Sequence, residues 1–160
     1  LDSEWIGVNF DFGNNFALLE DPHQVAEALA PYIMTTHVKD MSLARDENGF
    51  LLSEVPLGQG VLDLTRIMDL CERRKRDVQF NLEMITRDPL SVPVLDDRYW
   101  ATMPQIAAPQ LARTLKLAGE RQRTALPSVA GMDEAEKLAF EDNNVRKSFR
   151  FARNTLGLQS

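Results

Sequence analysis

Three short stretches predicted to be β-strands, each ending at or beside a charged or metal-ligating residue, constrain the fold of this chain more than any other feature. They cover residues 6–10, 34–38 and 78–82, and the side chains at or just after their ends are those of Asp11, His37 and Glu83. The first stretch is a nearly continuous apolar run, which is typical of parallel strands that are buried on both faces. Because α/β proteins place functional side chains at the carboxyl ends of such strands, we expect these three side chains to meet at one edge of a parallel sheet.

Helical patterns separate the three stretches. Asp21 and Pro22 have the residue types of a helix N-cap and first turn, and apolar spacing continues from there to about residue 32. A second helix is predicted over residues 62–74, with Cys71 on its apolar face. The alternation of strand and helix predicts an α/β fold. Three strands cannot close a barrel, so the chain is either part of a larger barrel or a small open sheet with exposed edges.

The remaining segments are less regular. Residues 42–57 are polar with an Asn-Gly turn at 48–49, which is compatible with a small hairpin. Prolines keep residues 90–95 extended, and helices are predicted over residues 105–121 and 133–156. The charged segment 72–77 is interpreted as a solvated helix end.

Composition excludes several classes of protein. The 160-residue chain has a formal net charge of −6 and a pI of about 4.9, which disfavours nucleic acid as a partner. A single cysteine excludes an internal disulfide and fits a reducing, cytoplasmic setting. No apolar run approaches the ~20 residues of a membrane span, and no signal peptide is expected from the first residues of the sequence. Because the chain begins at Leu1 directly before a strand, we expect it to come from a longer protein, which could form a homo-oligomer.

The residues at the strand ends suggest a metal site. Asp, His and Glu side chains suit Mn, Mg, Co or Zn. Asp11, His37 and Glu83 lie 26 and 46 residues apart, a spacing that suits neighbouring strands joined by helices. Structural roles remain open: Asp11 could cap a turn, and His37 could be a buried histidine with satisfied hydrogen bonds.

Other residues near the strand ends are candidates for substrate contact. Lys39 and Asp40 follow His37, and they could bind substrate or simply pair with each other. Arg87 follows the third strand and could bind a substrate phosphate or carboxylate, although a salt bridge to Asp88 is an equal alternative.

Four motifs in this order resemble the last three β/α units of the xylose isomerase-like TIM barrels. They are Val-Asn-Phe-Asp-Phe-Gly-Asn at 8–14, Thr-His-Val-Lys-Asp at 36–40, Pro-Leu-Gly-Gln-Gly at 56–60 and Asn-Leu-Glu at 81–83. The superfamily includes sugar isomerases and epimerases, inosose dehydratases and DNA-repair endonucleases. The resemblance implies a (β/α)8 TIM barrel of which residues 1–100 supply the last three strands. Residues 101–160 would then be a C-terminal helical extension packing on the barrel.

The resemblance also implies roles for individual residues. Asp11, His37 and Glu83 would be ligands of one divalent metal ion, and Glu83 would also be the catalytic base. The fourth ligand of the family would lie before Leu1. Many epimerases carry a histidine where this chain has Asn14, which could bind a substrate hydroxyl but could not act as a base.

The pattern of the repair endonucleases is not matched. Their additional zinc ligands correspond here to Leu52 and Glu54, so a trinuclear zinc cluster is not expected. The function implied is a metal-dependent isomerase or epimerase that acts on a sugar, sugar phosphate or polyol through a metal-stabilised enediolate. An inosose-type dehydratase on the same scaffold and a non-catalytic binding protein are the alternatives.

Overall fold

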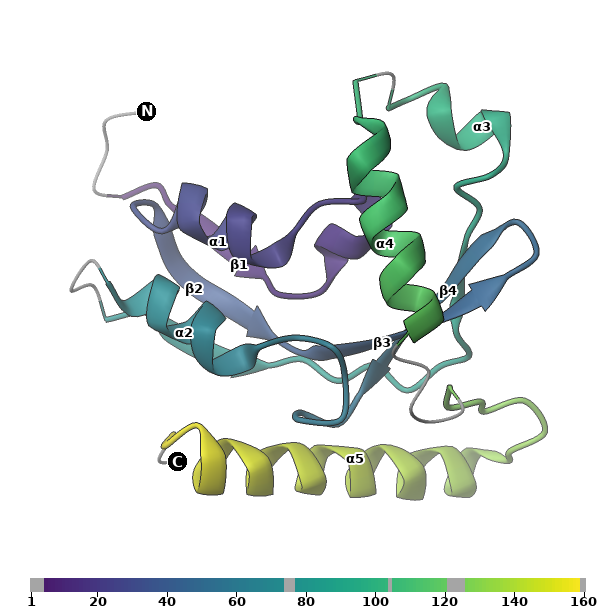
Figure 1. Cartoon of the computed structure of the whole chain (residues 1–160). Coiled ribbons are helices and arrows are strands. Elements are labelled where there is room, and N and C mark those ends of the chain that lie inside the picture. Colours follow the sequence, from purple (N-terminus) through teal and green to yellow (C-terminus); the bar gives the residue numbers. More distant parts are fainter. Residues whose placement is uncertain (1–4, 74–76, 104, 121–125, 159–160) are drawn as a thin grey trace.

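The computed structural model describes residues 5–73, 77–103, 105–120 and 126–158. It contains two three-stranded sheets, which Figure 1 shows side by side with helices packed around them. The parallel sheet, here called sheet A, consists of β1 (Val8–Asp11), β2 (Ile33–Val38) and β5 (Gln79–Leu82) in the order β1-β2-β5. The antiparallel sheet, here called sheet B, consists of β3 (Asp40–Asp46), β4 (Gly49–Val55) and β6 (Leu90–Val92) in the order β3-β4-β6.

Sheet A is formed by the three stretches predicted as strands, and their parallel arrangement is as predicted. The register aligns Asp11 with His37 and His37 with Asn81. The ladder continues past the strand ends, where the N–H groups of Phe12 and Glu83 donate to carbonyls of β2. All three strands therefore end at the same edge of the sheet.

The prediction that the first strand is buried on both faces was wrong. β1 begins at Val8, where pairing with Ile33 begins, and Ile6 is 56% exposed. In β1 only Phe10 is fully buried, whereas Asn9 is exposed. One face of sheet A is thus apolar and the other is polar.

Helices α1 (Pro22–Leu29) and α2 (Leu64–Glu72) cover the apolar face of sheet A. The Asp21 side chain accepts a hydrogen bond from the His23 N–H and caps α1 as expected. The helix ends earlier than predicted, with Ala30 as its C-cap and Pro31 next, because proline cannot continue the backbone hydrogen bonds. Cys71 is 1% exposed and packs in this core, as predicted, and burial raises the pKa of its thiol to about 12.

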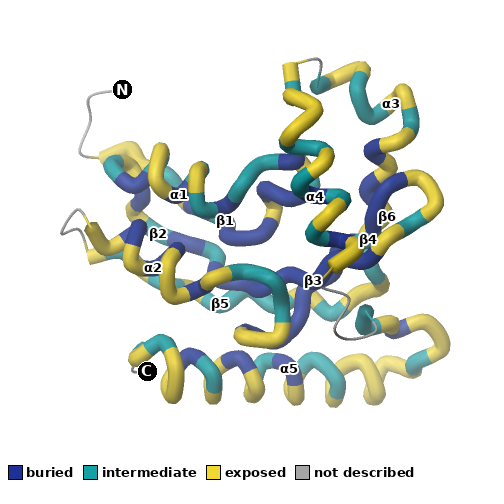
Figure 2. Tube along the Cα trace, in the orientation of Figure 1, coloured by how far each residue is buried: buried dark blue, intermediate teal, exposed yellow. Residues whose placement is uncertain are grey.

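The predicted hairpin is present and larger than its polar sequence suggested. β3 and β4 pair over their full length around a turn at Glu47 and Asn48. Phe50 and Leu43 lie in a second core, which also receives Phe16 from the 3-10 helix η1 (Asn14–Leu18) and Ala118 from helix α4 (Ala108–Glu120). Figure 2 shows β3 and β4 as largely buried.

The C-terminal helices pack on different parts of this framework. After the short helix α3 (Asp97–Trp100), α4 (Ala108–Glu120) contacts β3 and β4. Helix α5 (Glu134–Thr155) begins with a capping box between Asp133 and Glu136 and contributes Ala152 to the core of sheet A. Part of the charged segment 72–77 lies outside the described residues. Across the part of the chain that the structure describes, no helix combines the length and apolarity that crossing a membrane requires.

Candidate metal and substrate site

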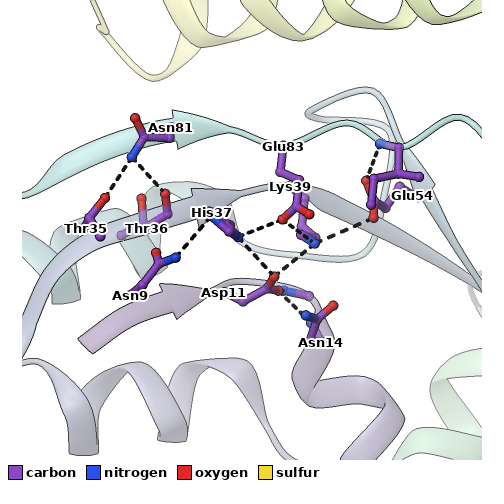
Figure 3. A network of polar contacts seen from close by, with 12 residues as sticks. Asn9, Asp11, Asn14, Thr35, Thr36, His37, Lys39, Glu54, Asn81 and Glu83 are labelled. Carbon is purple, nitrogen blue, oxygen red and sulfur yellow. Dashed lines mark hydrogen bonds and ion pairs between the residues drawn. The ribbon is translucent and has the colours of Figure 1, made fainter. Parts of the chain in front are cut away.

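Asp11, His37 and Glu83 converge at the carboxyl edge of sheet A. One ligand atom from each residue lies within 4.8 Å of the others. Nδ1 of His37 is 2.9 Å from Oε2 of Glu83 and 3.9 Å from Oδ2 of Asp11 (Figure 3). All three side chains are partly exposed, so a small ligand can reach them.

A turn fixes the carboxylate of Asp11. Its Oδ1 accepts hydrogen bonds of 2.8 Å from the N–H groups of Gly13 and Asn14. A Cβ atom at position 13 would approach the Met41 side chain to 2.5 Å, so a larger residue there would require that side chain to shift. With Oδ1 held in this way, Oδ2 faces His37 and Lys39. Asn14, expected as a substrate-binding residue, contributes its backbone N–H to this turn and is exposed.

Asn9 contacts the other nitrogen of the imidazole and was not expected in the site. Its Nδ2 lies 3.0 Å from Nε2 of His37. With the amide nitrogen of Asn9 as donor, Nε2 is the acceptor and Nδ1 carries the proton of the neutral ring, directed toward Glu83. Binding a cation through Nδ1 would require the opposite tautomer, with the Asn9 amide turned so that its oxygen faces Nε2. The alternation of strand side chains could have identified Asn9, because it lies two residues before Asp11 on the same face of β1.

Lys39 is buried among three carboxylates. Its side chain is 3% exposed, and its Nζ lies 2.9 Å from Asp11 Oδ2, 2.7 Å from Glu83 Oε2 and 3.6 Å from Glu54 Oε1. Burial alone would lower the pKa of Lys39, but the contacts with Glu83 and Asp11 and the charge of Glu54 outweigh it and raise the pKa. The suggested pairing of Lys39 with Asp40 was therefore wrong, since Lys39 pairs with carboxylates from three other elements.

Glu54 is the second residue of this site that sequence analysis did not assign. It comes from β4, its side chain is 4% exposed, and its Oε2 accepts a 2.7 Å hydrogen bond from the N–H of Ile85. Burial raises its pKa, against the opposing effects of the Ile85 N–H and the charge of Lys39. Glu54 thereby connects sheet B to the segment that carries Glu83.

Asp40 does not join the cluster, contrary to the expectation that it contacts substrate. Its carboxylate is 1% exposed and accepts hydrogen bonds from four backbone N–H groups, those of Met41, Gly58, Gly60 and Leu62. Burial raises its pKa despite these four hydrogen bonds. A carboxylate with four backbone donors has little capacity left for a ligand. We therefore assign Asp40 to holding the turn at residues 56–62.

Arg87 lies at the periphery. It is exposed, and its charge opposes the burial that raises the pKa of Glu54. Asp88, the alternative partner for Arg87, instead accepts hydrogen bonds from the Ser128 hydroxyl and from the N–H groups of Val129 and Ala130.

The donor set fits a divalent cation. It combines two carboxylate oxygens with one imidazole nitrogen, ligands that suit Mn, Mg, Co or Zn. Oε2 of Glu83 is buried and lies 2.7 Å from the Lys39 ammonium and 2.9 Å from Nδ1 of His37. A cation bound through this oxygen would therefore share it with Lys39.

The sequence model of the family described as xylose isomerase-like TIM barrel matches residues 1–113. The chain belongs to this family. It is also 36% identical over 80 residues to a 3-oxo-isoapionate decarboxylase of Pectobacterium atrosepticum. That match covers 49% of the chain and only 29% of the decarboxylase, so the chain spans under a third of that relative's length. A comparison with solved structures gives no significant match.

Proposed function

We propose that this chain supplies part of the active site of a metal-dependent enzyme that forms an enolate from a sugar-derived carbonyl compound. The observation that carries the proposal is the convergence of Asp11, His37 and Glu83 at the carboxyl edge of three parallel strands. In this proposal the three side chains hold one divalent ion, which would polarise the substrate's carbonyl oxygen and stabilise the enolate. The fourth ligand that the family resemblance implies would come from outside this chain.

The chain's own residues would prepare this site. The Gly13 and Asn14 amides hold Asp11, and Asn9 holds the imidazole of His37. We further propose that exposed Arg87 and the side chain of Asn14 contact the substrate, Arg87 through an anionic group and Asn14 through a hydroxyl. Lys39 is too deeply buried to touch substrate, and we assign it to supporting the carboxylates.

Two reactions share this enolate. Isomerisation or epimerisation needs a base to remove a proton from carbon, and Glu83 is the candidate base. Decarboxylation of a 3-oxo acid needs no base: the bond to the carboxylate carbon breaks, its electron pair enters the enolate, carbon dioxide leaves and a proton is added. Glu83 Oε2 is 2.7 Å from the Lys39 ammonium, so taking a proton from carbon would require that contact to weaken.

We place decarboxylation of a 3-oxo sugar acid ahead of isomerisation. The contact between Glu83 and Lys39 favours it, and so does the similarity to a 3-oxo-isoapionate decarboxylase. A small anionic substrate also suits the exposed guanidinium of Arg87. The buried, unpaired Cys71 suits a reducing compartment.

The first test is the metal content of the full-length protein after exchange into metal-free buffer and addition of Mn²⁺. We expect about one ion per chain in the parent, a strong loss in His37→Ala, and no change in His23→Ala. His23 is the matched control because it is the other histidine in the chain and contacts Asp21 outside the cluster. A parent that binds no Mn²⁺ would overturn the proposal.

The second test separates the reactions by product mass. Release of carbon dioxide from a 3-oxo sugar acid supports decarboxylation, whereas a product of unchanged mass from a ketose supports isomerisation. A metal-loaded protein that does neither with a panel of both substrate classes would contradict enolate chemistry.

A further inference from the structure

Lys39 contacts the two carboxylates of the candidate metal site through the oxygens that face His37. Its Nζ lies 2.9 Å from Asp11 Oδ2 and 2.7 Å from Glu83 Oε2. These are the oxygens closest to Nδ1 of His37, at 3.9 Å and 2.9 Å. A cation bound through these two oxygens would share them with the ammonium group.

A third carboxylate, that of Glu54, also contacts Lys39 and helps to hold it in position. Glu54 Oε1 lies 3.6 Å from Nζ, and Glu54 Oε2 accepts the 2.7 Å hydrogen bond from Ile85 N–H. Lys39 and Glu54 are 3% and 4% exposed, so water screens their charges little. Lys39 is the residue that leads from β2 into β3, and Glu54 comes from β4 of the hairpin. Glu54 is therefore positioned by sheet B, and Lys39 by the junction between the two sheets.

We propose that Lys39 is a positioning residue that acts as an internal cation of the metal site. It directs one oxygen each of Asp11 and Glu83 toward His37, and its charge limits how tightly these oxygens bind a metal ion. Glu54 has the opposite effect, because it holds Lys39 and partly offsets its charge. The proposal rests on the metal site proposed above but concerns residues to which no ligand role was given.

Removing Lys39 has two opposing effects on metal affinity, and the larger one determines whether binding becomes tighter or weaker. Removing Lys39 loses the orientation of two carboxylates, which would weaken metal binding. It also removes a positive charge that repels a divalent ion from a few ångströms away, in a setting with little water. Coulomb interactions at such distances exceed the effect of freeing two side chains whose oxygens are also held by other contacts. We therefore expect net tightening.

The test measures Mn²⁺ binding by isothermal titration calorimetry on the full-length protein. Lys39→Met keeps an unbranched side chain that is one atom shorter and removes its charge, and we expect Mn²⁺ to bind at least tenfold more tightly. Lys39→Arg keeps the charge, and we expect affinity within threefold of the parent. Glu54→Gln keeps an acceptor for the Ile85 N–H but removes a negative charge, and we expect Mn²⁺ to bind severalfold more weakly.

Two further variants keep the test decisive. Lys116→Met makes the same charge change on α4, where Lys116 is 71% exposed and pairs with Glu120, and its affinity should equal that of the parent. If Lys39→Met does not fold because Glu54 is left buried without a partner, the double variant Lys39→Met with Glu54→Gln removes both charges. We expect it still to bind Mn²⁺ more tightly than Glu54→Gln alone.

The outcomes separate this inference from the proposed function. A parent that binds no Mn²⁺ fails the proposed function itself. If the parent binds Mn²⁺ and Lys39→Met binds it with equal or lower affinity, the proposed role of Lys39 is wrong but the metal-site proposal is not affected. Opposite changes in Lys39→Met and Glu54→Gln support the inference, because residues with only a structural role would weaken binding in both.

Discussion

Sheets A and B differ in where their side chains are buried. In sheet B, β3 and β4 are buried along almost their whole length, with Phe50 at 0% and Leu43 at 1% exposure. In sheet A only one face is buried, and the other carries polar side chains that lead to Asp11 and His37. Packing and chemistry are therefore divided between the two sheets. Sheet B provides a buried core, and sheet A presents the candidate functional side chains.

This division between packing in sheet B and chemistry in sheet A is not complete, because Glu54 belongs to sheet B but lies in the candidate site. It belongs to β4 but contacts Lys39, which lies between Asp11 and Glu83. Substitutions in the core of sheet B should therefore change stability, and substitutions on the polar face of sheet A should change ligand binding. Glu54 should affect both.

The strongest test of this division is Phe50→Ala. Phe50 is fully buried in the core of sheet B, and truncating such a side chain costs about 3–5 kcal/mol of unfolding free energy. Chemical denaturation should measure this loss, while Mn²⁺ affinity at low temperature should be unchanged in the folded fraction. Leu138→Ala is the control, since Leu138 is 62% exposed on α5. A loss of Mn²⁺ affinity in folded Phe50→Ala would break the division.

Asp11→Asn tests the other side of the comparison. Asparagine keeps an oxygen for the Gly13 and Asn14 amides but removes the charge on the oxygen that faces His37. We expect Mn²⁺ affinity to fall at least about 100-fold. Replacing a residue that only hydrogen-bonds to a metal ligand already lowers metal affinity by about 10–100-fold. Asp142→Asn removes an equal charge from an exposed pair on α5 and should bind Mn²⁺ like the parent. Equal affinities of Asp11→Asn and the parent would remove Asp11 from the ligand set.

Much of sheet A could be predicted from sequence because its signals are local. Each strand ends at or beside a charged or metal-ligating residue, and Asp21 and Pro22 mark the start of α1. The grouping of Asp11, His37 and Glu83 follows from the rule that parallel strands end at one edge of a sheet. Their roles as ligands are still a proposal.

The contacts of Lys39 and Glu54 around Asp11, His37 and Glu83 could not be predicted from the sequence. Glu54 meets Lys39 because β4 folds back beside β3, and Ile85 then reaches Glu54 across 31 residues. Nothing in the residue pattern of a strand records such a distant contact. The prediction that Asp40 contacts substrate was wrong for a related reason. The four hydrogen-bond donors to its carboxylate are backbone N–H groups, and no residue type in the sequence identifies them.

Asp40→Asn should destabilise the join between the sheets. Asparagine has one oxygen where four N–H groups converge, so at least one buried donor is left without an acceptor. This costs about 1–3 kcal/mol of unfolding free energy. Gly60→Ala should act in the same direction, because its Cβ would collide with Asp40 and the Met41 carbonyl. Urea denaturation measures both, and parent-like stability of Asp40→Asn would contradict the structural assignment.

The smallest expected effect is a pH dependence at Glu54, the residue that links the two sheets. Burial raises its folded-state pKa above the ordinary value of 4.5. Between that value and the raised pKa, the folded protein binds more protons than the unfolded chain, so stability falls as pH rises through this window. Above the folded pKa the loss is complete and constant.

Glu54→Gln isolates this contribution, because glutamine cannot titrate and still accepts the hydrogen bond from Ile85 N–H. Asp40 also has a raised pKa, but it titrates in both proteins and cancels in the comparison. The unfolding free energy of the parent, relative to Glu54→Gln, should therefore decrease as pH rises above 4.5 and then level off. An increase over the same range would mean that the attraction of Lys39 for the ionised Glu54 exceeds the cost of its burial, so that this link between the sheets is held together by charge.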